Sequence, residues 1–285
     1  MRWQGRRQSS NVEDRRGSGG SAPRKLFGGG MGTIVILLIV WMLGGNPLDF
    51  LNLTDLGSAP SASSNYQPSA EEDQLAQFVS VVLADAEDVW DNLFRQSGSN
   101  YRKPTMVLYS GMVQSACGMN SSATGPFYCP GDEKIYIDLS FYQELQQKFK
   151  APGDFAMAYV IAHEVGHHVQ NLLGTSQQVM SLRNRLSEAE FNKYLVRLEL
   201  QADFYAGVWA NHAQKMKNIL EEGDIEEAIN AASAVGDDRI QKQMQGYVVP
   251  DAFTHGTSEQ RMRWFLKGFK SGDVNQGNTF EASSL

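Results

Sequence analysis

The chain has 285 residues, of which 42% are hydrophobic and 20% charged, and its formal net charge is −7. This composition is typical of a globular protein and leaves room for a single domain of about 200 residues. The charge is unevenly distributed, because residues 1–25 carry +5 and the remainder carries −12. An acidic body argues against a nucleic acid partner, since binding to phosphates requires a basic surface.

An uncharged apolar segment follows the basic N-terminal residues. No charged side chain occurs from Gly28 to Gly45, and residues 31–43 read MGTIVILLIVWML. This length reaches the lower limit of about 17–25 residues for a helix that crosses a bilayer. We therefore predict a disordered, basic cytoplasmic tail over 1–30 and a transmembrane anchor over 31–45. A cleaved signal peptide is the open alternative, because the apolar run is short.

The remaining chain divides by composition into a linker, one domain and a tail. Residues 46–69 are rich in Ser, Pro, Asn and Ala and are typical of a linker. We predict a folded domain over 70–270 and a flexible tail over 271–285. The domain begins with a capping-box spacing, Ser69 to Glu72, and an apolar period of three and four residues then predicts a helix of about six turns.

The rest of the domain contains strand patterns and then helix patterns. β-branched and aromatic residues bounded by Pro and Gly predict strands at Thr105–Tyr109 and Lys134–Asp138, with a further strand within 125–131. We expect these to form a small, mostly antiparallel sheet. The helical patterns that follow cover about 154–172, about 187–217, parts of 224–245, and 258–269. The order of helix, sheet and several helices predicts an α+β fold.

The chain has two cysteines, Cys117 and Cys129. Two are too few for a zinc site of four sulfurs. If the domain is exported, an oxidising compartment favours a disulfide between them across a loop rich in Gly, Asn and Ser. Two unpaired buried thiols are the alternative.

The most specific motif is H-E-x-x-H at residues 163–167. His163 and His167 are one turn apart on the same face of a helix, so both imidazoles can bind one ion. Glu164 lies about 100° around the same turn, where it can act as general base for a water without binding the ion. Chance produces this pattern about 0.005 times in a chain of this composition. His168 points elsewhere, and we expect it at the surface or supporting the site.

A catalytic zinc normally takes three protein ligands, so one more must lie elsewhere in the chain. Glu199 and Asp203 are four residues apart among apolar neighbours, where carboxylates are costly unless paired or bound to metal. We predict Glu199 as the third ligand of Zn²⁺ and Asp203 as the acceptor for the free ring nitrogen of a histidine ligand. A solvated acidic helix face is the alternative.

The segments HEVGHHVQ and ELQADFYAG resemble the H-E-x-x-H and E-x-x-A-D motifs of the gluzincin metallopeptidases, including the HtpX-like and CAAX-prenyl-protease type. With the basic N-terminus and the single apolar segment, the chain is most similar to the bacterial neutral zinc metallopeptidases of the YpfJ-like type. The resemblance covers nearly the whole chain. It implies a zincin-like fold, in which a sheet edge such as Phe127–Cys129 or Ile135–Asp138 holds an extended substrate beside the active-site helix.

A third segment, Phe253–Arg261, is similar to the Thr-His-Pro-Ser…Arg segment of the HtpX-like group, although Gly256 stands where that group has Pro. The resemblance implies that His255 donates to the oxyanion of the tetrahedral intermediate and that Arg261 braces the site. Alternatively, the hydroxyl residues between them simply cap the last helix.

Together these features predict a membrane-anchored zinc metallopeptidase that acts on a protein or peptide substrate. It would lie in the bacterial inner membrane as a single-pass protein with its catalytic domain on the periplasmic side. A zinc hydrolase acting on a non-protein amide is one alternative. A non-catalytic, membrane-tethered zinc-binding or chaperone-like module is another, which an intact Glu164 disfavours because metal binding alone does not require it.

Overall fold

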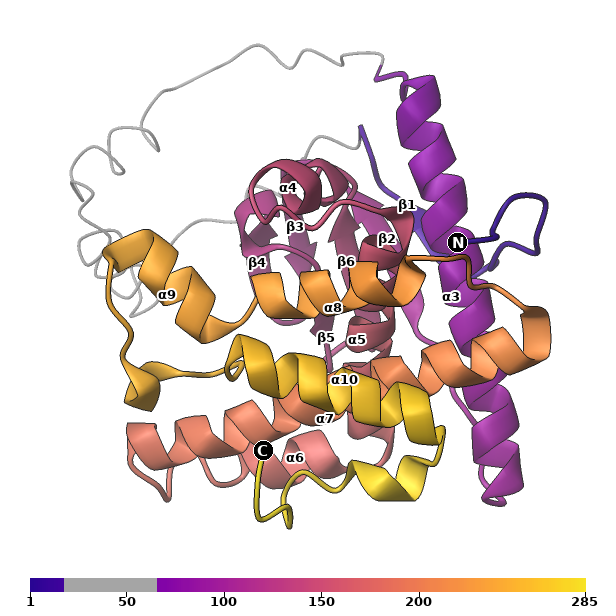
Figure 1. Ribbon diagram of the computed structural model, residues 1–285. Helices are drawn as coiled ribbons and strands as arrows, with labels where there is room; N and C mark the ends of the chain where they lie inside the picture. Colours follow the sequence, from indigo (N-terminus) through magenta and orange to yellow (C-terminus); the bar gives the residue numbers. More distant parts are fainter. Residues whose placement is uncertain (18–65) are drawn as a thin grey trace, which may run out of the picture. The chain divides into compact units, whose positions relative to one another are not determined.

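The computed structural model describes residues 1–17 and 66–285, and Met1–Arg16 folds into one unit with Pro68–Leu285 (Figure 1). The strands of this unit are β1 (Val12–Asp14), β2 (Thr105–Tyr109), β3 (Met112–Ser115), β4 (Gly118–Ser121), β5 (Phe127–Cys129) and β6 (Lys134–Asp138). Its α-helices are α3 (Ala70–Gln96), α4 (Phe141–Gln147), α5 (Asp154–Leu172), α6 (Thr175–Met180), α7 (Glu188–Lys217), α8 (Asp224–Ala234), α9 (Asp237–Gln245) and α10 (Ser258–Ser271). Short 3₁₀ turns are η1 (Ser122–Thr124), η2 (Pro250–Ala252) and η3 (Val274–Gly277).

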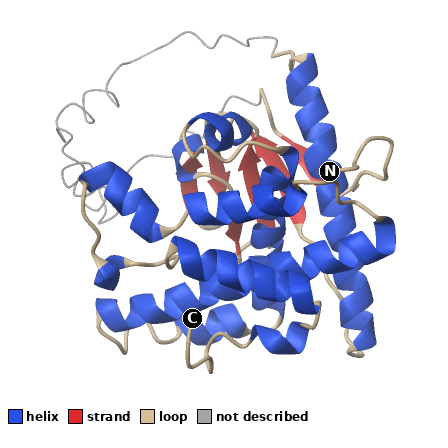
Figure 2. Ribbon diagram, in the orientation of Figure 1, coloured by secondary structure: helices blue, strands red, loops and turns tan. Residues whose placement is uncertain are grey.

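The main sheet has the strand order β1-β2-β6-β5 within the described residues, and helices pack beside it (Figure 2). β1 is parallel to β2 and β2 is parallel to β6, whereas β5 runs antiparallel to β6. The α+β class is confirmed, but the expectation of a mostly antiparallel sheet is wrong. β1 comes from the Arg-rich N-terminal segment, and β3 and β4 pair separately as an antiparallel hairpin.

The basic N-terminal residues are folded against α3, so the disordered tail predicted for 1–30 is wrong in its described part. Arg6 Nη2 lies 2.6 Å from Asp85 Oδ1, and Ser9 Oγ donates to Glu87 Oε1 at 2.5 Å. These two carboxylates are only 2% and 1% exposed. Buried carboxylates require partners, and the N-terminal segment supplies them.

The prediction of a single-pass inner-membrane protein is also corrected. Among residues 1–17 and 66–285, no helix combines the length and the apolar character that a membrane crossing needs. The predicted anchor over 31–45 lies outside the described residues. Met1–Arg16 and Pro68–Leu285 belong to one folded unit, in which β1 pairs with β2.

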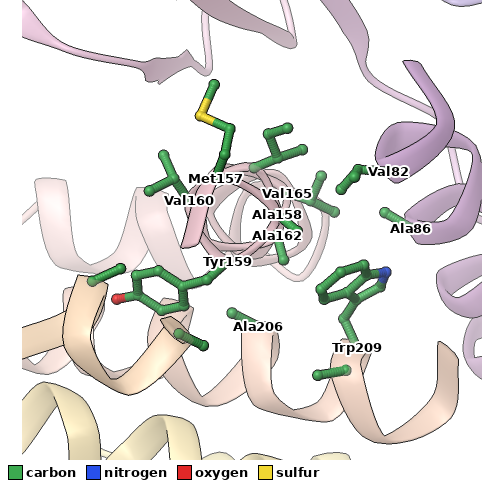
Figure 3. Close-up of a cluster of buried hydrophobic side chains, with 14 of the residues drawn as sticks. Val82, Ala86, Met157, Ala158, Tyr159, Val160, Ala162, Val165, Ala206 and Trp209 are labelled. Atoms are coloured by element: carbon green, nitrogen blue, oxygen red, sulfur yellow. The ribbon is translucent and has the colours of Figure 1, made fainter. Parts of the chain in front are cut away.

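Helix α5 lies at the centre of the unit and packs against α3, α7 and α8. In Figure 3, Val82 and Ala86 of α3 face α5 from one side, and Ala206 and Trp209 of α7 face it from another. The predicted start of α3 is confirmed, since Ser69 and Glu72 form a capping box. The predicted ranges of α5 and α7 are confirmed as well. The expected helical region at 224–245 is divided into α8 and α9.

Glycines allow α7 to approach its neighbours closely. A Cβ at Gly166 of α5 would lie 2.9 Å from the carbonyl oxygen of Ala202 on α7. A Cβ at Gly207 of α7 would lie 2.1 Å from the carbonyl oxygen of Phe265 on α10. No real Cβ atom can lie so close to a neighbouring backbone. Glycine at each of these positions therefore allows the two helices to cross at this separation. The first crossing sets α5 and α7 face to face at the predicted site.

The C-terminal residues are also ordered, so the flexible tail predicted for 271–285 is wrong. Thr279 is fully buried, and its hydroxyl donates to the carbonyl oxygen of Arg197 at 2.6 Å. Gln201 Nε2 donates to the carbonyl oxygen of Gly277 at 2.9 Å. Both contacts are made to α7, so the chain's last turn supports the helix that carries Glu199.

A disulfide joins Cys117 and Cys129, as predicted, and ties the β3–β4 hairpin to β5. The two residues are 12 apart in the sequence. Closing a loop of this length restricts the unfolded chain and stabilises the fold by about 3 kcal/mol.

We expect the double variant Cys117→Ser, Cys129→Ser to lose about 3 kcal/mol of unfolding free energy, measured by urea denaturation. Wild type treated with a thiol reductant is the control and should match the variant. Equal stability of oxidised wild type and the variant would contradict the prediction.

Candidate metal centre

The crossing of α5 and α7 brings together the three residues predicted as ligands. Glu199 Oε2 lies 3.2 Å from His163 Nε2, and Glu199 Oε1 lies 3.3 Å from His167 Nε2. One nitrogen or oxygen atom of each residue lies within 4.8 Å of the other two. The spacing of four residues on α5 stacks the imidazoles on one helical face, and α7 supplies the carboxylate opposite them.

The hydrogen bonds of the two rings suit a metal ion at this point. His163 Nδ1 donates to Asp203 Oδ1 at 2.8 Å, and His167 Nδ1 donates to Gln170 Oε1 at 2.9 Å. With their protons on Nδ1, both rings present an Nε2 lone pair to the same space. Two imidazole nitrogens and one carboxylate are a donor set that zinc accepts when one position remains for water. The residues therefore fit a catalytic zinc.

Asp203 is the centre of a buried network behind His163, in agreement with its predicted position. It is fully buried and receives Arg261 Nε on Oδ2 at 2.8 Å and Tyr159 Oη on Oδ1 at 2.5 Å. Burial raises the pKa of this carboxyl, but Arg261 and His163 outweigh burial and lower the pKa to about 2. The carboxylate stays charged and holds the His163 ring in one orientation. Arg261 thus braces the site through Asp203.

Glu164 is 8% exposed and lies on the same turn of α5 as His163. Burial raises its pKa above the ordinary value for a glutamate, although both neighbouring histidines oppose the rise. A carboxylate with a raised pKa accepts a proton more readily near neutral pH.

His255 is held by Asp237, a residue that sequence reasoning missed. Asp237 Oδ2 accepts the backbone N–H groups of Thr254 at 2.7 Å, His255 at 2.6 Å and Gly256 at 3.0 Å. Its Oδ1 lies 3.2 Å from His255 Nδ1. The His255 side chain is 51% exposed. Burial lowers its pKa, but the charge of Glu199 and the hydrogen bond and charge of Asp237 outweigh burial and raise the pKa.

The alternative interpretation of this segment, as the cap of the last helix, is confirmed. Thr257 and Gln260 form a capping box at the start of α10. The two interpretations of the segment are compatible, because Thr257 and Gln260 cap α10 whereas His255 does not take part in the cap.

His168 lies away from the three candidate ligands. It is fully buried, with Nδ1 3.0 Å from Tyr128 Oη and Nε2 2.6 Å from the carbonyl oxygen of Arg102. Asn171 also donates to Tyr128 Oη, at 3.0 Å. These hydrogen bonds connect β5 to α5. His168 therefore positions the edge of the sheet beside the helix that carries His163 and His167.

Comparisons with other proteins place the chain in a family. The chain is 50% identical over 287 residues to the uncharacterized protein YpfJ of Escherichia coli strain K12. This match covers 99% of this chain and 100% of that protein. It is 45% identical over 195 residues to the uncharacterized proteins Rv2575 of Mycobacterium tuberculosis H37Rv and Mb2605 of Mycobacterium bovis, covering 65% of each chain. No solved structure shows a significant match. Residues 1–280 match the sequence family described as "Putative neutral zinc metallopeptidase", and the chain belongs to that family.

Proposed function

We propose that this protein is a zinc-dependent peptidase in which His163, His167 and Glu199 bind the metal and Glu164 is the general base. The observation that supports this most is the convergence of two Nε2 atoms and one carboxylate, with both Nδ1 atoms already engaged. The motifs H-E-x-x-H at 163–167 and E-x-x-A-D at 199–203 also support a place among the gluzincins.

The reaction follows from the roles of the side chains. A bound zinc ion supplies Lewis-acid polarisation of a water and of the substrate carbonyl. The Glu164 carboxylate accepts a proton from the attacking water as the carbon–oxygen bond forms. Glu164 then delivers that proton to the leaving nitrogen as the carbon–nitrogen bond breaks. His255, oriented by Asp237, donates a hydrogen bond to the carbonyl oxygen as negative charge develops there.

Strand β5 is the proposed binding edge for the peptide substrate. Within the described residues it is the end strand of the main sheet, paired on one side with β6. Tyr128 of β5 is bonded to His168 of α5, five residues after His163. An extended peptide can add to such an edge through main-chain hydrogen bonds, with its scissile carbonyl near α5.

Metal analysis of the whole protein tests the proposed ligands. Wild type should contain one zinc per chain, and His163→Ala and Glu199→Ala should each lose more than about 90% of it at equal free zinc, because three ligands normally hold a catalytic zinc. His212→Ala is the matched control. That histidine lies on α7 and bonds the carbonyl oxygen of Gly272 at 2.8 Å, away from the centre.

A peptide library and a panel of small amides, assayed with the same samples, separate peptidase from general amidase activity. Cleavage of peptides by wild type and not by the metal-free variants supports the proposal. Full zinc content in both ligand variants would refute the assigned centre.

A further inference from the structure

A hollow of about 370 Å³ lies between the connection from α4 to α5 and the junction of α8 with α9. Its lining includes four cationic side chains, Lys148, Lys150, Arg239 and Lys242, together with Phe149. We call it the basic hollow. Its volume lies in the range of small-molecule sites, about 300–1,000 Å³.

Three of the four cations of the basic hollow have no ion-pair partner in the described part of the chain. No carboxylate is among its lining residues. Lys148 reaches Glu144 at 3.7 Å, an exposed pair one helical turn apart. In the described part of the chain, no ion pair involves Lys150, Arg239 or Lys242. Acidic residues outnumber basic ones in the protein by seven, so three neighbouring cations without an acidic partner are contrary to its general composition.

A second hollow, of about 480 Å³ along α10, is also basic but differs in this respect. Arg263 Nη2 lies 2.5 Å from Glu259 Oε1. Lys267 Nζ lies 4.3 Å from the centre of the Trp264 ring, in cation–π contact. Two of its cations therefore already have partners within the fold. This hollow, which we call the α10 hollow, is the natural control for the basic hollow.

We propose that the basic hollow binds a small ligand bearing at least two phosphate charges. Arg239 presents a planar fork that pairs with two phosphate oxygens, and the lysines add mobile point charges around it. The partly buried Phe149 ring, which Lys148 Nζ approaches to 5.4 Å from its centre, adds apolar surface to the lining. A phosphate group would offset the repulsion among Lys150, Arg239 and Lys242, for which the lining of the hollow supplies no carboxylate.

The position of the basic hollow connects it to the candidate metal centre without sharing residues with it. One wall is the connection that leads into α5, which carries His163. The other wall is α9, whose first residue, Asp237, holds His255. The binding proposal is independent of the proposed peptidase activity, because none of its residues touches zinc or substrate there.

Titration calorimetry of the full chain with inorganic pyrophosphate tests the proposal. We expect saturable binding of one pyrophosphate per chain. The double variant Arg239→Gln, Lys242→Gln should bind at least 10-fold more weakly, and Lys150→Gln should also weaken binding. Arg263→Gln, Lys267→Gln, in the α10 hollow, should leave it unchanged. Pyrophosphate also chelates zinc, so each titration is repeated in the His163→Ala background, where the result should be the same.

A second arm identifies the source of the phosphate. If vesicles containing cardiolipin, whose headgroup carries two phosphates, bind the protein and compete with pyrophosphate, the ligand is a lipid headgroup. If they do not compete, it is a soluble phosphate compound. Both results support the phosphate site. Unsaturable heats, equal weakening by both double variants, or loss of binding in the His163→Ala background alone would overturn it.

Discussion

The Glu164→Gln variant should hydrolyse peptides about 10²- to 10⁴-fold more slowly than wild type while still binding one zinc per chain. Glutamine has nearly the same shape as glutamate, so packing in the 8%-exposed position is kept. Its amide cannot accept the proton of the attacking water. The effect should appear in kcat, because the lost interaction exists only during the reaction.

The measurement combines kcat on a cleaved peptide with zinc content from the same preparation. Glu188→Gln, an exposed residue in the first turn of α7, is the control and should keep wild-type values. A Glu164→Gln enzyme with unchanged kcat would eliminate Glu164 as the base. A variant that also lost its zinc would instead show that Glu164 supports the metal.

Arg261→Met should lower the free energy of unfolding by about 3–5 kcal/mol, the cost of removing one partner from a buried ion pair. Arg261 is 5% exposed and Asp203 is fully buried, and the guanidinium makes two hydrogen bonds to that carboxylate. Methionine keeps most of the packing but leaves Asp203 with only Tyr159 and His163 as partners.

Urea unfolding of the protein in chelator measures this effect without a contribution from bound metal. The control is Arg263→Met on the same helix, because its pair with Glu259 is exposed and is worth at most about 1 kcal/mol. If the two variants lose similar amounts, the buried pair does not stabilise the fold as described.

Patterns among neighbouring residues correctly predicted the helices and strands whose formation depends on neighbouring residues. The capping box at Ser69, the strands Thr105–Tyr109 and Lys134–Asp138, and the helix over 154–172 all lie where the sequence placed them. The three candidate ligands also converge, because four-residue spacing fixes one face of each helix. What spacing could not specify was the crossing of α5 and α7, which depends on Gly166.

The missed features depend on contacts between distant residues. The Arg-rich segment before Gly17 has the composition of a disordered tail, and only the buried acids of α3 explain why it is ordered. The parallel pairings were missed because β1 was not expected and because β2 and β6, which were, pair only across the intervening β3–β4 hairpin and β5. Asp237 was missed because its partner His255 lies 18 positions away, across a loop. A Gly followed by two Asp residues at 236–238 is a helix-start pattern that gave no indication of this role.

The docking of the first residues has a consequence during synthesis. The backbone N–H of Arg2 bonds the carbonyl oxygen of Ile219, and β1 completes its pairing on β2. At about 5–20 residues per second, the ribosome needs roughly 10–40 s to make the chain between Arg2 and Ile219. Arg2 therefore lacks this partner until Ile219 has been made, long after Asp85 and Glu87 of α3 have become available to Arg6 and Arg7. Chaperones and proteases meet this arginine-rich segment before Asp85 and Glu87 have been made.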